Sequence, residues 1–197
     1  MNYGEVRRMA LRLLFSDTSA GQPIPADYND QADYLAAIPS LVDNALLDIA
    51  VRTDCLTAVV PLSSLRCEGE RGGKRVIALP NDCYETVAVL LPGLVPAAFR
   101  VLADRLYVEP ALPEDTVVYY RRFPVSVGSA PEDSTALDGT AEMHALVPFY
   151  VAAYLVLYDD SYRYGVLRSE YENRLMALRQ AKAELSPIRN VYEAVTA

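Results

Sequence analysis

The chain has 197 residues, of which 52% are hydrophobic and 22% charged, and its formal net charge is −8. This balance predicts a globular protein with one domain, or one domain with an elaboration. No segment is basic, which argues against tight binding to a phosphate backbone, although an acidic surface that nucleic acid slides past is compatible with it. Three widely spaced cysteines without a CxxC pair indicate free thiols in a reducing compartment.

The N-terminal part of the chain, residues 1–56, is expected to be helical. Residues 3–15 carry an apolar stripe at helical spacing, with arginines inside the pattern that argue against a signal peptide. A loop with two prolines and a glycine follows, and a second helical region runs from about 27 to 54. We expect Pro39 to divide this region into a short helix and a longer one, because proline suits the first turn of a helix and not its interior.

The pattern becomes β-rich between residues 57 and 124. Short segments such as TAVVPL, KRVIAL and DTVVYYRRF alternate with turn residues, which predicts a small antiparallel sheet of four to six strands. The stretch VLADRLYV predicts a tight hairpin through residues 103–105. The RGGKR stretch at 71–75 lacks the spacing of a phosphate-binding loop, so we interpret it as a hairpin turn.

A loop over residues 125–140 separates the β region from a long C-terminal helix over 141–185, which ends before Ser186–Pro187. Residues 186–197 form a tail. Apolar stripes on the helices before and after the β region predict that these helices pack together, antiparallel to each other. The expected fold is therefore mainly α with inserted β: a helical bundle carrying a small antiparallel sheet between its second and last long helices.

The most unusual stretch is VPFYVAAYLVLYDDSYRYGV, residues 147–166. Its apolar run is too short to cross a membrane, which takes about 20 residues, so we expect neither insertion nor secretion. The tyrosines are four residues apart, which places them in one stripe of a helix: Tyr150, Tyr154, Tyr158 and Tyr162. Such a helix is apolar on nearly all sides, and two interpretations stay open: ordinary core, or an interface shared between the chain's own core and a second subunit.

Residues able to perform chemistry are few. The single histidine, His144, is expected to face solvent or cap a helix. The aspartates at 159–160 are interpreted as a surface pair that interrupts the apolar run, and the acidic residues of the 125–140 loop as solvating it. We find no pattern for a catalytic, metal or cofactor site, and the sequence predicts a protein that is not an enzyme.

Three segments resemble a known family, the head-to-tail connector proteins (adaptors, or tail accessory factors) of tailed bacteriophages. DYLAAIPSLVDNALLDIA at 33–50 is similar to the family's P-x-x-[IVL]-[ND]-x-A-L helix. IALPNDCYETVAV at 77–89 resembles its L-P-x-D-[FY]-x-E step into a β-meander, which ends here in YYRRFP with an extra arginine. Cys83 and Tyr84 depart from the usual aromatic placement. ALVPFYVAAYLVLYDD and YENRLMALR look like the closing helix.

The resemblance implies a structural role in the virion neck. Family members form a ring, usually a dodecamer, below the portal protein. The ring extends and seals the channel through which the genome leaves, and it docks the tail or a second neck protein. The resemblance thus implies assembly in the bacterial cytoplasm, self-association, passage of DNA without sequence-specific binding, and no membrane partner. An acidic channel wall suits passage because it repels phosphate.

The tail, SPIRNVYEAVTA, is the second candidate site. Its apolar residues are too many for an idle terminus and too few for a core, and the family's C-terminal segments reach into the portal. We therefore expect a portal-binding tail, with a tail folded onto its own bundle as the alternative. The residues concerned are Ile188, Arg189, Val191, Tyr192 and Val195.

Two other classes of function remain open on the sequence alone. One is a host or prophage oligomeric binding module, which neighbouring portal and capsid genes would argue against. The other is an enzyme with an unrecognised site, which converging titratable groups in a cleft would favour.

Overall fold

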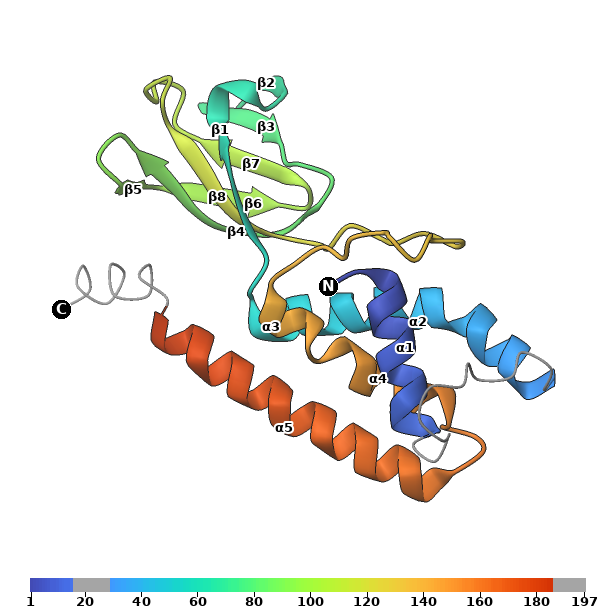
Figure 1. Ribbon diagram of the computed structural model, residues 1–197. Coiled ribbons are helices and arrows are strands. Elements are labelled where there is room, and N and C mark those ends of the chain that lie inside the picture. The colour runs from blue at the N-terminus through green and yellow to red at the C-terminus, as the bar shows by residue number, and fades with distance from the viewer. Residues whose placement is uncertain (16–28, 186–197) are drawn as a thin grey trace. The chain divides into compact units, whose positions relative to one another are not determined.

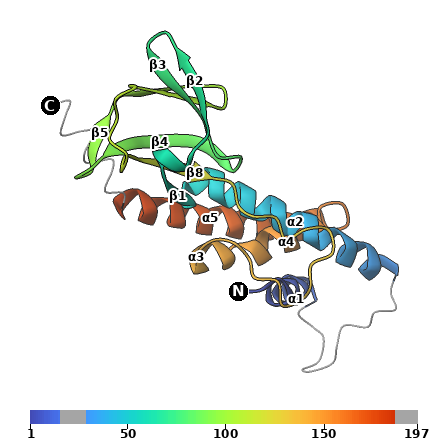
Figure 2. The ribbon, with the colours of Figure 1, turned by 90° about the horizontal axis from the view of Figure 1, so that it is seen from above.

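The computed structural model describes residues 1–15 and 29–185, and the chain divides into two compact units (Figures 1 and 2). The helical unit comprises Met1–Cys55 and Pro124–Ala197, and the β unit comprises Leu56–Phe123. The fold is mixed α/β, 43% helical and 26% strand, with two four-stranded antiparallel sheets. The prediction of a mainly α bundle carrying one small sheet is therefore wrong, because the β region is a unit with its own core.

The helical unit is built around a short central helix. Its helices are α1 (Tyr3–Leu14), α2 (Asn29–Thr53), α3 (Ala141–His144), α4 (Val147–Leu155) and α5 (Ser161–Leu185). The central helix is α4, which packs against α1, α2 and α5. That position explains its composition, since a helix covered on several sides has no polar face. The fully buried residues of α4 are Val147, Val151, Ala152 and Ala153.

The first helix follows its sequence signals, and its prediction is confirmed. The Asn2 side chain accepts a hydrogen bond of 2.9 Å from the backbone N–H of Glu5. The Glu5 carboxylate in turn accepts one of 2.9 Å from the backbone N–H of Asn2. This reciprocal capping box satisfies two N–H groups that the helix itself leaves without partners. Val6, Ala10 and Leu14 then share the buried face.

The second helix runs unbroken through Pro39, so the predicted division there is wrong. A proline in a helix interior removes one backbone hydrogen bond. Tertiary packing outweighs that loss here, because the residues on either side of Pro39 belong to one fully buried stripe. The stripe consists of Ile38, Val42, Ala45, Leu46, Ile49 and Ala50.

The predicted continuous helix over 141–185 is also wrong, because the chain breaks between α3 and α4 and again between α4 and α5. At the second break the Asp160 carboxylate accepts a hydrogen bond of 2.9 Å from the backbone N–H of Arg163, which caps the start of α5. The chain reverses there, and α5 returns antiparallel to α4.

The reversal also overturns the predicted antiparallel packing of the second and last long helices. Tyr34, near the start of α2, donates a hydrogen bond to Asp159, just before α5. Further along both helices, the Tyr171 hydroxyl donates to Asp48 over 2.6 Å. Contacts that advance together along both helices mean that α2 and α5 run parallel, which Figure 1 shows.

The segment over 125–140 is held against the helices by hydrogen bonds rather than solvated as a loop. The backbone N–H groups of Tyr3 and Gly4 donate to carbonyl oxygens of this segment over 2.8 and 3.0 Å. The Arg7 guanidinium pairs with Asp133 at 2.9 Å. A Cβ on Gly4 would lie 2.8 Å from the Asp133 side chain, so the close approach of α1 requires glycine.

The β unit contains eight strands in two sheets, ordered β1-β8-β4-β5 and β2-β3-β7-β6. One hydrophobic core takes residues from both sheets, including Val89 and Val118 from the first and Ile77 and Leu106 from the second. The strands are β1 (Thr57–Pro61), β2 (Cys67–Arg71), β3 (Lys74–Ala78), β4 (Cys83–Leu91), β5 (Val95–Ala97), β6 (Phe99–Leu102), β7 (Arg105–Val108) and β8 (Val117–Arg122).

Two hairpins predicted from turn chemistry are confirmed. Strands β6 and β7 pair on either side of Ala103 and Asp104, and Ala103 has a positive φ of 53°. Strands β2 and β3 pair around Gly72 and Gly73, whose φ values are 58° and 72°. Positive φ at both central residues matches the twist of paired strands, and glycine adopts it without steric cost.

Candidate interaction surface

The four predicted tyrosines do not form one stripe, because the turn between α4 and α5 separates them. Tyr150 and Tyr154 are half-buried on α4, and their ring centroids lie 4.5 Å apart. Tyr158 and Tyr162 lie at and beyond the turn and are 94% and 82% exposed. One pair is therefore part of the chain's own packing, and the other pair is presented to solvent.

The buried half of this tyrosine set surrounds an arginine of α5. The Arg168 guanidinium carbon lies 5.7, 5.6 and 5.0 Å from the ring centroids of Tyr150, Tyr154 and Tyr171. Its Nη1 is buried without a hydrogen-bond partner in the described part of the chain, and the faces of the aromatic rings provide favourable electrostatic contact instead. Burial raises the pKa of Tyr150 to about 12, with a smaller contribution from Tyr154. This cluster fixes α4 to α5.

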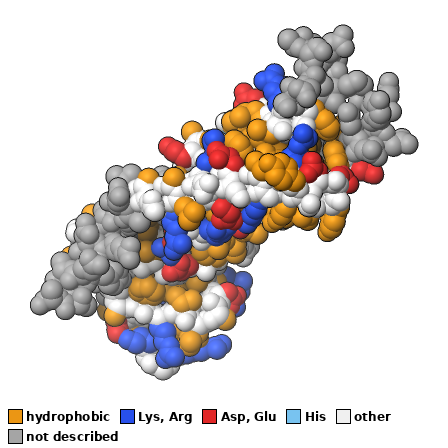
Figure 3. Space-filling view, turned by 90° about the horizontal axis from the view of Figure 1, so that it is seen from below, with side chains coloured by type: hydrophobic (Ala, Val, Ile, Leu, Met, Phe, Trp, Pro, Cys, Tyr) orange, Lys and Arg blue, Asp and Glu red, His pale blue; other side chains and the backbone are white. Residues whose placement is uncertain are grey.

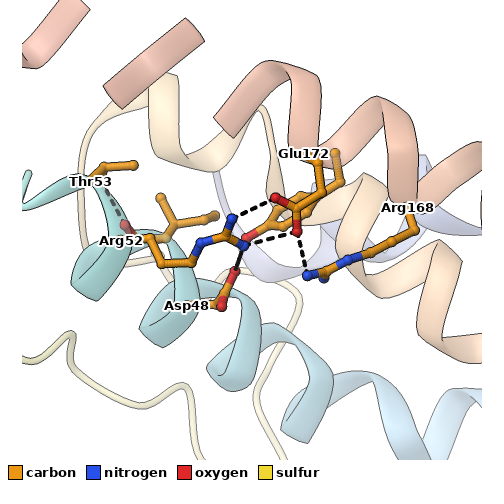
Figure 4. Close-up of polar contacts among 7 residues, drawn as sticks. Asp48, Arg52, Thr53, Arg168 and Glu172 are labelled. Carbon is orange, nitrogen blue, oxygen red and sulfur yellow. Dashed lines mark hydrogen bonds and ion pairs between the residues drawn. The ribbon is translucent and has the colours of Figure 1, made fainter. Parts of the chain in front are cut away.

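A network of ion pairs connects α2 to α5 (Figure 4). The Arg52 guanidinium donates to both oxygens of Glu172, over 2.9 and 2.6 Å, and its Nη1 lies 3.3 Å from Asp48. Arg168 reaches Glu172 from the other side at 2.5 Å.

The hydrogen bond from Arg52 holds the pKa of Glu172 below its usual value. Burial, and then the hydrogen bond to Asp48, raise the pKa of Tyr171. Arg168 and Glu172 are therefore engaged in ion pairs within the chain and do not form a solvated charged face.

The opposite side of α5 carries an exposed row without charge, which we call the outer face of α5. Its residues are separated by four, three, four, three and four positions, an average close to the helical repeat of 3.6 residues, which keeps the side chains on one side of the helix. Tyr162 is 82% exposed, Val166 53% and Met176 52%. Figure 3 looks onto this side of the helical unit, where orange and white side chains run between charged ones. The outer face consists of Tyr162, Val166, Ser169, Asn173, Met176 and Gln180.

An open groove of about 860 Å³ lies along the first half of the outer face. Phe149, Tyr162 and Val166 line it together with Gly165. A Cβ added at Gly165 would meet nothing within 4 Å, so no packing contact in the described chain requires glycine there. Glycine inside a helix costs about 0.5–1 kcal/mol relative to alanine. At this position the missing side chain leaves open space at the groove.

Helix α2 carries a second uncharged row, the outer face of α2. Its residues are exposed and separated by four, three and four positions, and they consist of Ser40, Asn44, Leu47 and Val51. Leu47 is 41% exposed and Val51 45% exposed. Neither outer face was recognised from the sequence, although the alternating steps of four and three positions between uncharged side chains are visible there. The regularity of the tyrosines drew attention away from it.

His144 is only 6% exposed, and its Nε2 lies 3.1 Å from the Asp138 carbonyl oxygen, so the expectation of a solvent-facing histidine is wrong. The 125–140 segment covers it. Within residues 1–15 and 29–185, no group of three or more His, Cys, Asp or Glu side chains is placed to hold a metal ion. The proposed tail residues, 188–195, lie outside the described residues.

One described helical segment, Asp33–Thr53, is long and apolar enough to cross a membrane by length and composition alone. It has a mean hydropathy of 1.4, so the apolar run at 147–158 is not the strongest candidate in the chain. In the structure this segment buries its apolar stripe against other helices and carries the Asp48 and Arg52 pairs to α5. The core of the helical unit accounts for part of its composition, and exposed apolar residues such as Leu47 and Val51 make up another part.

Comparison of the sequence with protein-family models finds no match, and comparison with curated proteins finds no similar protein.

Proposed function

We propose that this chain is a structural protein that assembles into a ring, and that the ring is a head-to-tail connector below the portal of a tailed bacteriophage. The observation that carries the proposal is the two-sided character of α5. One side is buried in the chain's own core, and the opposite side is uncharged and exposed over five turns. A long exposed row with Tyr, Val and Met is typical of a surface that binds another protein.

The resemblance of three segments to the connector family supplies the specific role. In that role the ring binds the portal on one side and the tail or a second neck protein on the other. DNA passes through without sequence-specific binding, which suits a chain with net charge −8 and no basic segment. No membrane takes part, and the ring is assembled in the cytoplasm of the bacterial host.

The test is the composition of virus particles. An epitope-tagged copy of the chain, expressed from the genome that encodes it, should appear at the junction of head and tail in immunogold electron micrographs. Loss of the gene should give filled heads that lack tails and leak DNA. Tailed particles that form normally without the chain would contradict the proposal, and a genome without portal and capsid genes nearby would favour a host or prophage binding module.

The portal contact is assigned to the tail, residues 186–197, on the grounds of its composition and the family resemblance. We expect deletion after Leu185 to leave the described fold intact, because the core residues of the described part of the chain all lie at or before Leu178. We expect the truncated chain to have normal far-ultraviolet circular dichroism and to be lost from particles. A truncated chain that still joins the portal with near-normal affinity would show that the tail is not the anchor. A truncated chain that fails to fold would show that the tail belongs to the bundle.

A further inference from the structure

We propose that the outer face of α5 binds the outer face of α2 of a second copy of this chain, in a head-to-tail contact. This inference rests on the proposed ring and names the surfaces that form it. Both faces are uncharged and exposed, and their residues recur in alternating steps of four and three positions, which places them on one side of a helix where a second helix can pack.

Charge selects α2 as the partner of α5. Outside the ion pairs of Figure 4, helix α5 carries four basic and two acidic side chains, whereas α2 carries three acidic ones and no basic one. A contact between two α5 helices would bring together two positive elements, and a contact between two α2 helices two negative ones. Only the mixed pair is complementary, and complementary charge favours encounter of the right surfaces and disfavours the wrong ones.

Shape supports the same pairing. The groove on α5 has Gly165 on its surface and the rings of Phe149 and Tyr162 among its lining residues. The outer face of α2 presents two aliphatic side chains one turn apart, Leu47 and Val51, which suit such a groove. At 1.5 Å rise per residue the α2 row spans roughly 17 Å and the α5 row roughly 27 Å. The longer face can therefore accommodate the whole of the shorter one.

The proposed contact is heterologous: the α5 face of one copy binds the α2 face of the next, and the reciprocal pair does not form between the same two copies. Each copy offers one face to the copy before it and the other to the copy after it. A contact of this kind generates a ring when the rotation between copies closes. A contact between two identical faces would stop at a dimer.

The experiment uses the full-length chain and three single variants. Val166→Lys breaks the outer face of α5, and Leu47→Lys breaks the outer face of α2. The control is Met9→Lys on α1, a residue 39% exposed where Leu47 is 41% exposed. Circular dichroism confirms that each variant is folded, and sedimentation velocity measures association at concentrations up to about 1 mM, where even a contact of about −4 kcal/mol is populated.

We expect the wild-type chain and Met9→Lys to associate beyond the dimer. Val166→Lys and Leu47→Lys should each weaken association at least about tenfold, because each buries an unpaired charge in the contact. An equimolar mixture of these two variants should form a heterodimer and no larger species, since one intact α5 face and one intact α2 face remain.

Four outcomes would overturn the inference. They are a wild-type chain that stays monomeric at about 1 mM, a Leu47→Lys variant that still forms homodimers, face variants that associate like the wild type, and a mixture that gives no heterodimer. A monomeric wild type whose Val166→Lys variant is lost from particles would assign the groove to another virion protein. Association in solution is measured without virus particles, so this inference can fail while the connector proposal stands. The connector proposal can likewise fail while this inference stands.

Gly165→Ala gives an independent test, because its two effects have opposite signs. With open space around the new Cβ, alanine should stabilise α5 in the isolated chain and raise the midpoint of thermal unfolding. The same methyl group makes the groove shallower and should weaken association severalfold. A variant that is more stable and associates as well as the wild type would show that the groove is not the binding site.

Discussion

At the residue scale, Gly4 and Gly165 differ in what an added side chain would meet. At Gly4 an added Cβ would meet the Asp133 side chain at 2.8 Å, whereas at Gly165 it would meet nothing. We expect Gly4→Ala to lower the free energy of unfolding of the helical unit by about 1–3 kcal/mol, because α1 and the 125–140 segment must move apart. Urea unfolding followed by circular dichroism measures this, with Gly165→Ala as the control. Equal effects at both positions would contradict the packing described here.

The pKa of Glu172 makes the joint between α2 and α5 sensitive to acid. Because the bond from Arg52 lowers this pKa in the folded chain, the pair stabilises the fold above the unfolded pKa, near 4.5. That stabilisation is lost as the pH falls through the lower, folded value. The pair is partly exposed, so we expect Glu172→Gln to cost only about 1 kcal/mol at pH 7.

The pH dependence separates this role from a simple loss of packing. The difference in unfolding free energy between the wild type and Glu172→Gln should be constant from about pH 6 to 8 and should shrink toward zero below about pH 4. Glu170→Gln, which removes a partner of Arg174 within α5, is a matched control with a smaller effect. A difference for Glu172→Gln that does not change with pH would contradict the ion-pair explanation.

At the scale of elements, local signals predicted some parts of the fold well. The capping box of α1 and the hairpin turns of β2–β3 and β6–β7 are set by neighbouring residues, so they can be predicted without knowing the rest of the chain. The breaks around α4 could not be predicted in this way. The apolar pattern continues through 156–158, whereas α4 ends inside it at Leu155, where this helix packs against three others.

The candidate surface was predictable only in part. The sequence predicted that the four tyrosines divide between the chain's own core and a subunit contact, but not which of them lie where. Tyr158 and Tyr162 are exposed in the structure, and a subunit contact there stays a prediction. The division itself depends on the turn before α5, which moves Tyr158 off the helix. Whether two β segments share a sheet is likewise set by pairing between distant residues, which is why one sheet was predicted where two exist.

The central position of α4 predicts strong sensitivity to added volume. Ala152 has no exposed surface, so Ala152→Leu should force neighbouring side chains out of place and cost about 1–3 kcal/mol or more. Ala177→Leu, at an exposed position of α5, is the matched control and should change the stability by less than about 0.5 kcal/mol. Thermal and urea unfolding measure both. A tolerated leucine at position 152 would mean that α4 is not enclosed by its own chain.

At the scale of the whole molecule, the chain enters the β unit along strand β1 and leaves it along strand β8, and these two strands are adjacent. Strands β1 and β8 pair, with Thr57 opposite Arg121, and the Arg122 N–H donates to the Leu56 carbonyl oxygen over 3.0 Å. The two ends of the β unit therefore lie side by side. A few glycines replacing 56–123 can bridge this distance, since each residue spans up to about 3.5 Å.

Excision of the β unit should separate folding from assembly. The helical unit keeps its core and both outer faces, so we expect the shortened chain to fold and to associate with an affinity within about tenfold of the full chain, a difference of about 1.4 kcal/mol. Residues 56–123 alone contain a closed core of their own and should fold as a monomer. Circular dichroism and sedimentation velocity on both pieces measure this. If the β unit alone associates while the helical unit stays folded and monomeric, then self-association belongs to the sheets and not to α2 and α5.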